Sequence, residues 1–185
     1  MTRVMRFATW TWIVVWVVGL SSVLLVRSAR SAAPRRGPAT SAVGGDEIVT
    51  VFIGASFCGA TKTPGLPQVI ERMKQSLGDV ATKDHKRLVT VGVALDWAPE
   101  DGIEFLKHFG RFDELHTGRN WLNIGAVDYI WRGVPGTAGL PQVVVLERHV
   151  TQEKTGLAVT EDRLLRRLVG ADQIREWVTS NTPLP

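Results

Sequence analysis

Apolar positions form one long run near the start of the chain and several short runs after residue 45. Residues 7–26 contain no charged side chain. Twenty residues of α-helix rise about 30 Å, the thickness of the hydrocarbon layer of a bilayer. The pattern therefore predicts an N-terminal transmembrane helix, with a membrane anchor over residues 1–27 that contacts the lipid bilayer through residues 7–26.

A cleaved signal peptide is the alternative interpretation of this segment. Ser21 and Ser22 interrupt the apolar run, and residues 29–31 offer a small-residue cleavage site. A signal core normally has about 7–15 apolar residues, and this run is longer. The length favours a retained anchor.

The residues that follow, 28–45, are rich in Ala, Ser, Gly, Pro and Arg and show no apolar periodicity. This composition predicts a flexible linker. The arginines around residues 7–26 slightly favour a cytoplasmic domain by the positive-inside rule. A short basic tail followed directly by an apolar run is, however, typical of export anchors. We therefore expect a single-pass protein of a bacterial cytoplasmic membrane, with its domain on the periplasmic or extracytoplasmic side.

The shorter runs predict one α/β domain over residues 46–185. β-branched apolar runs predict strands at residues 48–53, 88–95 and 142–146, and a weaker pattern predicts one at 156–160. Apolar residues at helical spacing predict helices at residues 64–77, 99–110 and 172–178. An inserted helix over residues 126–131 is expected to pack on the sheet edge.

Net charge changes the list of expected partners. The formal charge of +4 comes from six arginines in residues 1–36, where no acid occurs; the rest of the chain has 16 basic and 18 acidic residues. A mildly acidic domain offers no basic footprint for phosphate backbones, so nucleic acid is not an expected partner. No nucleotide loop, HExxH or haem-attachment motif occurs, and the four histidines are scattered, so neither a cofactor nor a metal site is predicted.

Cys58 is the single cysteine, so no intramolecular disulfide can form. It follows the first predicted strand, in the stretch VTVFIGASFCGATK of residues 49–62. A free cysteine is commonly a small buried hydrophobe, and an inert Cys58 is therefore one reading.

The stretch resembles the active-site strand and turn of the thioredoxin superfamily. Phe57 stands where thioredoxins usually carry Trp, and Cys58, Gly59 and Lys62 follow in the family's order. Gly139, Leu140 and Pro141, before the strand QVVVL, are similar to that family's cis-proline loop, and residues 168–178 are similar to its C-terminal glycine and helix.

This resemblance implies a thioredoxin-like fold, a central mixed sheet flanked by helices. It implies a cis Pro141 beside Cys58, with the Leu140 backbone presented to an extended substrate. A helix that begins at Cys58 would favour its thiolate, and the Thr61 hydroxyl could donate a hydrogen bond to it. The implied catalytic residue is Cys58, and the implied substrate-binding residues are Phe57, Gly59, Thr61, Leu140 and Pro141.

The chain departs from the family at two positions. Thr61 replaces the second cysteine, and Phe52 replaces a buried acid of the strand. A lone thiolate can attack a disulfide and form a mixed disulfide, but an external thiol must then release it. The expected activity is thiol–disulfide exchange through Cys58 alone. If Cys58 is inert, the alternative is a redox-inactive binding or assembly subunit of a membrane complex.

Residues 55–61, ASFCGAT, also resemble the ASxCGxT motif of glutathione peroxidases. That likeness implies a peroxide-reducing Cys58 that cycles through a sulfenic acid. The family's Gln-bearing segment and its Trp-Asn-Phe are missing, and Asn120, Trp121 and Asn123 are a poor substitute.

A protein partner is expected under either main reading. The stretch of residues 116–139 holds Trp121 and Trp131, and tryptophan is enriched at interface hot spots. These two residues are the predicted partner-binding residues. The alternative is that they only pack the inserted helix against the sheet.

Overall fold

The computed structural model describes residues 45–185 apart from 135, 154–155 and 160–161. The predicted anchor over residues 1–27, and the linker up to residue 44, lie outside the described residues. Among the residues that are described, no helix is both long and apolar enough to cross a membrane.

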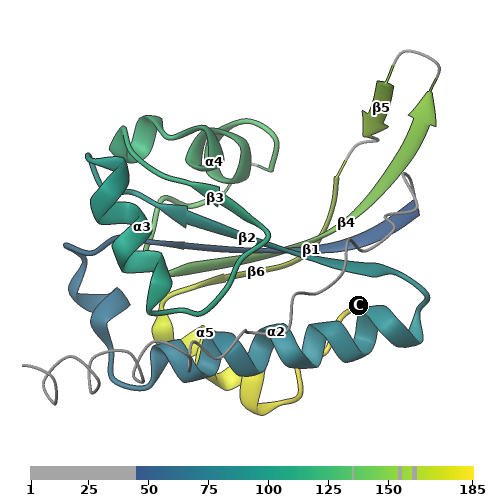
Figure 1. The fold of residues 1–185 in the computed structure, drawn as a ribbon. Helices are drawn as coiled ribbons and strands as arrows, with labels where there is room; N and C mark the ends of the chain where they lie inside the picture. Colours follow the sequence, from purple (N-terminus) through teal and green to yellow (C-terminus); the bar gives the residue numbers. More distant parts are fainter. Residues whose placement is uncertain (1–44, 135, 154–155, 160–161) are drawn as a thin grey trace, which may run out of the picture. The chain divides into compact units, whose positions relative to one another are not determined.

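The described domain is built on a six-stranded mixed sheet (Figure 1). Its strands are β1 (Gly45–Gly54), β2 (Arg87–Ala94), β3 (Glu114–His116), β4 (Gln142–Glu153), β5 (Gly156–Val159) and β6 (Arg163–Val169). β1 pairs in parallel with β2, which pairs in parallel with β3, while β4 runs antiparallel to β1. β4 pairs with β6 along its first half and with β5 along its second half.

Helices cover both faces of this sheet. They are α2 (Leu66–Lys83), α3 (Pro99–Lys107), α4 (Ile124–Ala126) and α5 (Ala171–Thr179), with short turns η1 (Gly59–Lys62), η2 (Asn120–Leu122) and the π-helical η3 (Val127–Trp131). In Figure 1, α2 and α5 lie on one side of the sheet and α4 lies on the other. The fold is therefore the mixed sheet flanked by helices that the thioredoxin resemblance implies.

Alternate residues of β1 enter two separate apolar cores, as the two-residue period of a strand requires. Ile48 and Phe52 pack with residues of α2, α3 and α5, whereas Val49, Val51 and Ile53 pack with residues of α4 and η3. All five side chains are at most 1% exposed. Both faces of β1 are buried, which explains its continuous apolar sequence.

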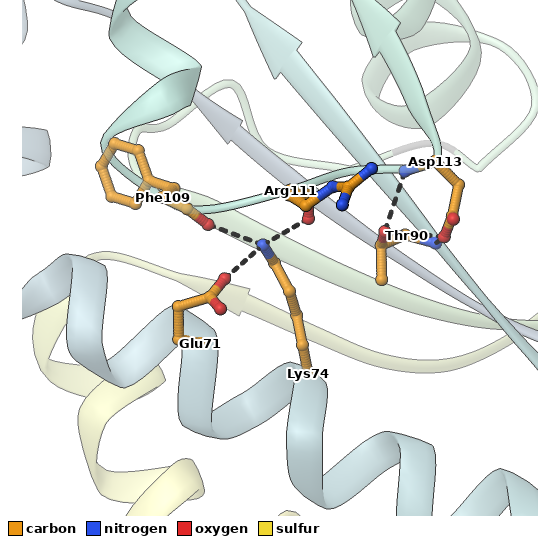
Figure 2. A network of polar contacts seen from close by, with 6 residues as sticks. All are labelled: Glu71, Lys74, Thr90, Phe109, Arg111 and Asp113. Atoms are coloured by element: carbon orange, nitrogen blue, oxygen red, sulfur yellow. Dashed lines mark hydrogen bonds and ion pairs between the residues drawn. The ribbon is translucent and has the colours of Figure 1, made fainter. Parts of the chain in front are cut away.

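Lys74 fixes the loop between α3 and β3 (Figure 2). Its ammonium donates to the Glu71 carboxylate at 2.6 Å and to the backbone carbonyls of Phe109 and Arg111 at 2.6 and 2.9 Å. The Asp113 carboxylate attaches the same loop to β2, because it accepts hydrogen bonds from the backbone N–H and the hydroxyl of Thr90, both at 2.8 Å. Burial lowers the pKa of Lys74, while the Glu71 hydrogen bond opposes that shift.

Most of the predicted elements are confirmed. Strands occupy the four expected places, the last over Gly156–Val159 with Thr160 outside the described residues. The helix predicted at residues 64–77 begins at Leu66 and continues to Lys83. β3 and β6 were not predicted, because β3 has three residues and β6 carries three arginines among seven positions.

The insert differs from its prediction in position and in type. Its helix begins at Ile124, and its last five residues form a π-helical turn. Ala126 and Ile130 are at most 1% exposed and belong to the second apolar core. The insert therefore covers a face of the sheet rather than its edge, because its apolar side chains fill the space above β1, β2 and β4.

Candidate functional site

Cys58 lies in a short turn after the last residue of β1. Its backbone N–H donates to the Ala55 carbonyl at 3.2 Å, and its own carbonyl accepts the N–H of Thr61 at 3.2 Å. A single 3₁₀ turn, η1, follows, and α2 begins only at Leu66, after Gly65 at φ +80°. The helix that the resemblance would begin at Cys58 does not begin there; it begins at Leu66, near the start at Pro64 that the apolar spacing predicts. The long helix starts eight residues later, so its N-terminus gives no support to a Cys58 thiolate.

The Thr61 hydroxyl closes this turn. It lies 2.6 Å from the Ala55 carbonyl oxygen and 2.7 Å from the Cys58 carbonyl oxygen, and the residue is 2% exposed. A hydroxyl has one proton to donate, and both neighbours are carbonyl acceptors. The expectation that Thr61 donates to the Cys58 sulfur is therefore corrected, because that proton is used by the backbone of the turn.

The structure places Cys58, Trp121 and Leu140 against one apolar core. All three are partly buried and pack against the second apolar core, to which β1 contributes Val51 and Ile53. The Leu140–Pro141 bond is cis, as the resemblance implies. Cys58, Trp121 and Leu140, the residue before the cis-proline, thus pack against the same apolar core.

The remaining predicted site residues surround this group. Phe57 is 56% exposed and Gly59 is exposed, so both are open to a bound partner. The rings of Trp121 and Trp131 are 5.9 Å apart, centroid to centroid, at 59°, and Trp131 is 47% exposed. The two predicted partner-binding tryptophans therefore form one aromatic pair, in which Trp121 packs against the same apolar core as Cys58 and Trp131 is exposed.

Two residues that the sequence analysis missed hold the proline loop. Gln142 is fully buried, and its side-chain amide donates to the carbonyls of Thr137 and Gly139 at 3.0 and 3.1 Å. Arg167 donates to the Gln142 side-chain oxygen and to the Tyr129 carbonyl at 3.0 Å. Burial lowers the pKa of Arg167. The sequence gives no signal for this contact, because Arg167 lies on a strand that the apolar pattern did not reveal.

Asp96 is the third residue that the sequence analysis missed. It lies beyond β2, at the edge where the parallel strands β1 and β2 end, and it is 3% exposed. Its carboxylate accepts the Ser56 backbone N–H, at 3.3 Å from each oxygen, and also the Ser56 hydroxyl. The sequence did contain a signal for Asp96, because it is an acidic residue directly after an apolar strand. That strand runs parallel to the one that precedes Cys58.

Phe52 confirms that β1 carries no acid at the position where thioredoxins often do. It is 1% exposed, and its ring centroid is 4.4 Å from that of Phe109. Phe52 belongs to the first apolar core, whereas Cys58 packs against the second. An aromatic cluster therefore replaces the acid, on the far side of the sheet from the thiol.

An apolar cleft of about 640 Å³ lies beside the turn. Ser56 and Thr61 line one wall, and Phe105 and Phe109 line the other. Because these phenylalanines belong to the first core, the cleft opens on the opposite side of the turn from Trp121 and Leu140.

Asn120 and Asn123, which were compared with the peroxidase motif, form hydrogen bonds with backbone groups close to them in the chain. The Asn120 side chain accepts the Trp121 N–H at 2.7 Å. The buried Asn123 side chain donates to the Gly118 carbonyl at 3.0 Å and accepts the Gly125 N–H at 2.8 Å, which caps α4. Within the described ranges, no three His, Cys, Asp or Glu residues form a group that could hold a metal ion.

Comparisons with known proteins give structural likenesses only. No family and no curated protein matches the chain. Among solved structures, the chain is similar to a thiol:disulfide interchange protein DsbE from Chlorobium tepidum, at 19% identity and a TM-score of 0.39, over 74% of this chain and 81% of that one. It is also similar to a thiol-disulfide isomerase from Corynebacterium glutamicum, at 16% identity and a TM-score of 0.37, over 67% and 71%.

A third similar structure is a secreted Mycobacterium tuberculosis disulfide oxidoreductase, at 13% identity and a TM-score of 0.32, over 72% of this chain and 81% of that one. Similarity at this level does not establish a family for the chain. The class defined by its own fold and site is an α/β thioredoxin-like domain with a single cysteine at the end of its first strand.

Proposed function

We propose that the protein carries out thiol–disulfide exchange through Cys58 alone. The observation that supports this most is the position of the thiol: it is partly exposed, at the end of β1, and shares its apolar support with Leu140 and Trp121. A core cysteine would be enclosed on all sides. A thiol at the rim of an apolar surface is open to a disulfide carried by a partner protein.

The chemistry follows from the single sulfur. The Cys58 thiolate attacks one sulfur of the partner disulfide, a new S–S bond forms, and the partner's other sulfur leaves as a thiolate that takes up a proton. Phe57, Gly59 and the Leu140–Pro141 segment contact the partner chain. Because Thr61 is no thiol, two equivalents of an external thiol complete the reduction of the partner disulfide.

The test is to incubate the full chain with a peptide that contains one intramolecular disulfide, quench with acid and measure intact mass. We expect an adduct of one chain and one peptide, and none with Cys58→Ser. An unmodified wild-type chain under conditions in which it remains folded would contradict the proposal.

A second function, as an assembly subunit of a membrane complex, is supported by a separate observation. Four large apolar side chains in or next to the insert are strongly exposed: Trp97 at 73%, Leu122 at 62%, Ile124 at 54% and Trp131 at 47%. Clustered exposed apolar residues are typical of protein interaction surfaces.

The assembly function predicts that the chain extracted from its native membrane migrates in a complex larger than a monomer. Leu122→Ser combined with Trp131→Ser should return it to monomer size, whereas Cys58→Ala should not. Migration of the wild-type chain as a monomer would contradict this function.

We also propose that residues 7–26 tether the protein to a bacterial cytoplasmic membrane with the domain on the outer side. The uncharged apolar run supports this. Protease added to intact spheroplasts should digest the domain. Complete protection until the membrane is broken would place the domain inside.

A further inference from the structure

Asp96 follows the end of β2 and contacts both the Cys58 turn and the segment that carries Trp121. The Leu95 N–H donates to the Gly54 carbonyl at 2.8 Å, so the pairing with β1 continues one residue beyond the end of β2 and delivers Asp96 next to the Cys58 turn. The Asp96 carbonyl accepts the N–H of Asn120 at 3.3 Å, in the segment that carries Trp121. One residue therefore contacts the turn with its side chain and the insert with its backbone.

The carboxylate has an unusual set of partners for a buried charge. Among the described residues, no Lys, Arg or His forms an ion pair with Asp96, and the donors that reach it both belong to Ser56. A buried carboxylate needs hydrogen-bond donors, and in the described structure Ser56 supplies them through its backbone N–H and its hydroxyl.

The other hydrogen bonds of the turn stay local. The Cys58 N–H and the Thr61 hydroxyl both reach the Ala55 carbonyl, and the Thr61 N–H reaches the Cys58 carbonyl. In the part of the chain that the structure describes, the side-chain hydrogen bonds that join this turn to another strand all run from Ser56 to Asp96. The orientation of the turn, and of the thiol two residues after Ser56, depends on this contact.

We infer that Asp96, acting through Ser56, is a positioning residue that fixes the Cys58 thiol against the second apolar core. The inference rests on the proposed exchange function and deepens it. It assigns to the end of β2 a role that the sequence of the Cys58 turn does not reveal. Without the Ser56–Asp96 contact, the turn remains closed by Thr61 and packed through Ala55 and Cys58, but it loses its side-chain hydrogen bonds to the end of β2.

The test is the second-order rate at which Cys58 of the full, folded chain reacts with 4,4′-dithiodipyridine, a neutral disulfide. Attack forms a Cys58–thiopyridyl disulfide and releases one thiopyridone, whose absorbance is followed. We expect Asp96→Asn to slow this reaction about tenfold, since small misplacements of a reacting group have effects of this size or larger. Ser56→Ala should slow it about threefold.

Two further variants separate positioning from a merely structural role. Ser56→Thr keeps the hydroxyl and should restore the wild-type rate. The double variant Ser56→Ala, Asp96→Asn should react no more slowly than Asp96→Asn, because both substitutions remove the same contact. Asp79→Asn, which removes an exposed acid of α2, is the control for loss of one negative charge and should react at the wild-type rate.

All rates are measured at a temperature where thermal unfolding shows each variant to be folded. If Asp96→Asn does not fold, the comparison of Ser56→Ala with Ser56→Thr decides alone. Equal rates for wild type, Ser56→Ala and Asp96→Asn would overturn this inference and leave the exchange function intact. A folded wild-type chain that does not react, although the unfolded chain does, would instead overturn the exchange function.

Discussion

The Thr61 hydroxyl meets two carbonyl oxygens at the base of the Cys58 turn. Its bonds to Ala55 and Cys58, together with 2% exposure, make it a buried link within the turn. In a two-cysteine thioredoxin site, this position would carry the second thiol. Here a hydroxyl occupies this position and closes the turn.

At this residue scale we predict that Thr61→Val lowers the free energy of unfolding of the full chain by about 1–2 kcal/mol, because buried acceptors lose a donor. Thr63→Val is the matched control. Its hydroxyl donates to the Ala60 carbonyl at 2.7 Å in an exposed setting, and its loss should change stability by less than about 0.5 kcal/mol. Urea denaturation of both variants measures the difference. Equal effects would show that the Thr61 bonds do not stabilise the turn.

Single residues also show what the sequence could predict of the site. Cys58, Leu140 and Pro141 were predicted as site residues because the short motifs that contain them resemble those of the thioredoxin superfamily. Asp96 and Gln142 were not. Their roles come from backbone groups of segments far away in the chain, and no local pattern shows which carbonyl or N–H a side chain will meet.

Among the elements, α2 and α3 are joined by a single charged residue. Lys74 points from α2 to the carbonyls of Phe109 and Arg111, where α3 has ended (Figure 2). The Lys74 ammonium also lies 3.8 Å from the centroid of the Phe112 ring. It is 9% exposed. The three hydrogen bonds of the ammonium use all of its donors, so this buried charge is fully satisfied.

We predict that Lys74→Met lowers the free energy of unfolding by about 1–3 kcal/mol, since two carbonyls lose their donor. Amide hydrogen exchange should speed up over residues 109–113 more than over β1. The control is Lys107→Met, which removes only an exposed pair with Glu104 and should leave both the unfolding midpoint and the exchange pattern unchanged. Exchange that rises uniformly over the domain would contradict a local role for Lys74.

Element prediction from the sequence succeeded where burial produced a period. β1, β2, α2 and α5 each bury apolar residues at the spacing of their type, and all four were expected. β6 was missed because its exposed positions carry arginine, while a neighbouring strand supplies the pairing. The apolar spacing placed the start of α2 at Pro64, two residues early, because Gly65 before the observed start is in the left-handed region.

For the domain as a whole, charged contacts on β4 connect distant parts of the chain. Glu147 pairs with Lys86, which follows α2, and with Arg163 of β6. Hydrogen bonds from Lys86 and Arg163 lower the pKa of Glu147, and the same contact raises the pKa of Lys86. These contacts join the sheet to the end of α2 at the opposite end of β1 from Cys58.

The sign of the pH effect follows from the lowered pKa of Glu147. Its contribution to stability is present above the ordinary glutamate pKa and is lost as pH falls through the lower value of the folded state. Glu147→Gln should therefore be less stable than wild type near neutral pH, by about 0.5–1 kcal/mol because the pair is partly solvent-exposed. The difference should shrink as pH falls below the ordinary glutamate pKa of about 4.3 and should disappear below the lower pKa of the folded state. Urea midpoints of both proteins measured against pH test this, and a constant difference would contradict it.

The central claim is that the Cys58 thiol is reactive in the folded protein. The most direct measurement compares its rate of reaction with 4,4′-dithiodipyridine in the folded full chain and in the same chain unfolded in urea. The account predicts a folded-state rate of the same order as the unfolded rate, or faster, with one equivalent of thiopyridone released. Reaction that occurs only after unfolding would show a buried, inert thiol, and would leave the exposed Trp131 surface as the functional part of the domain.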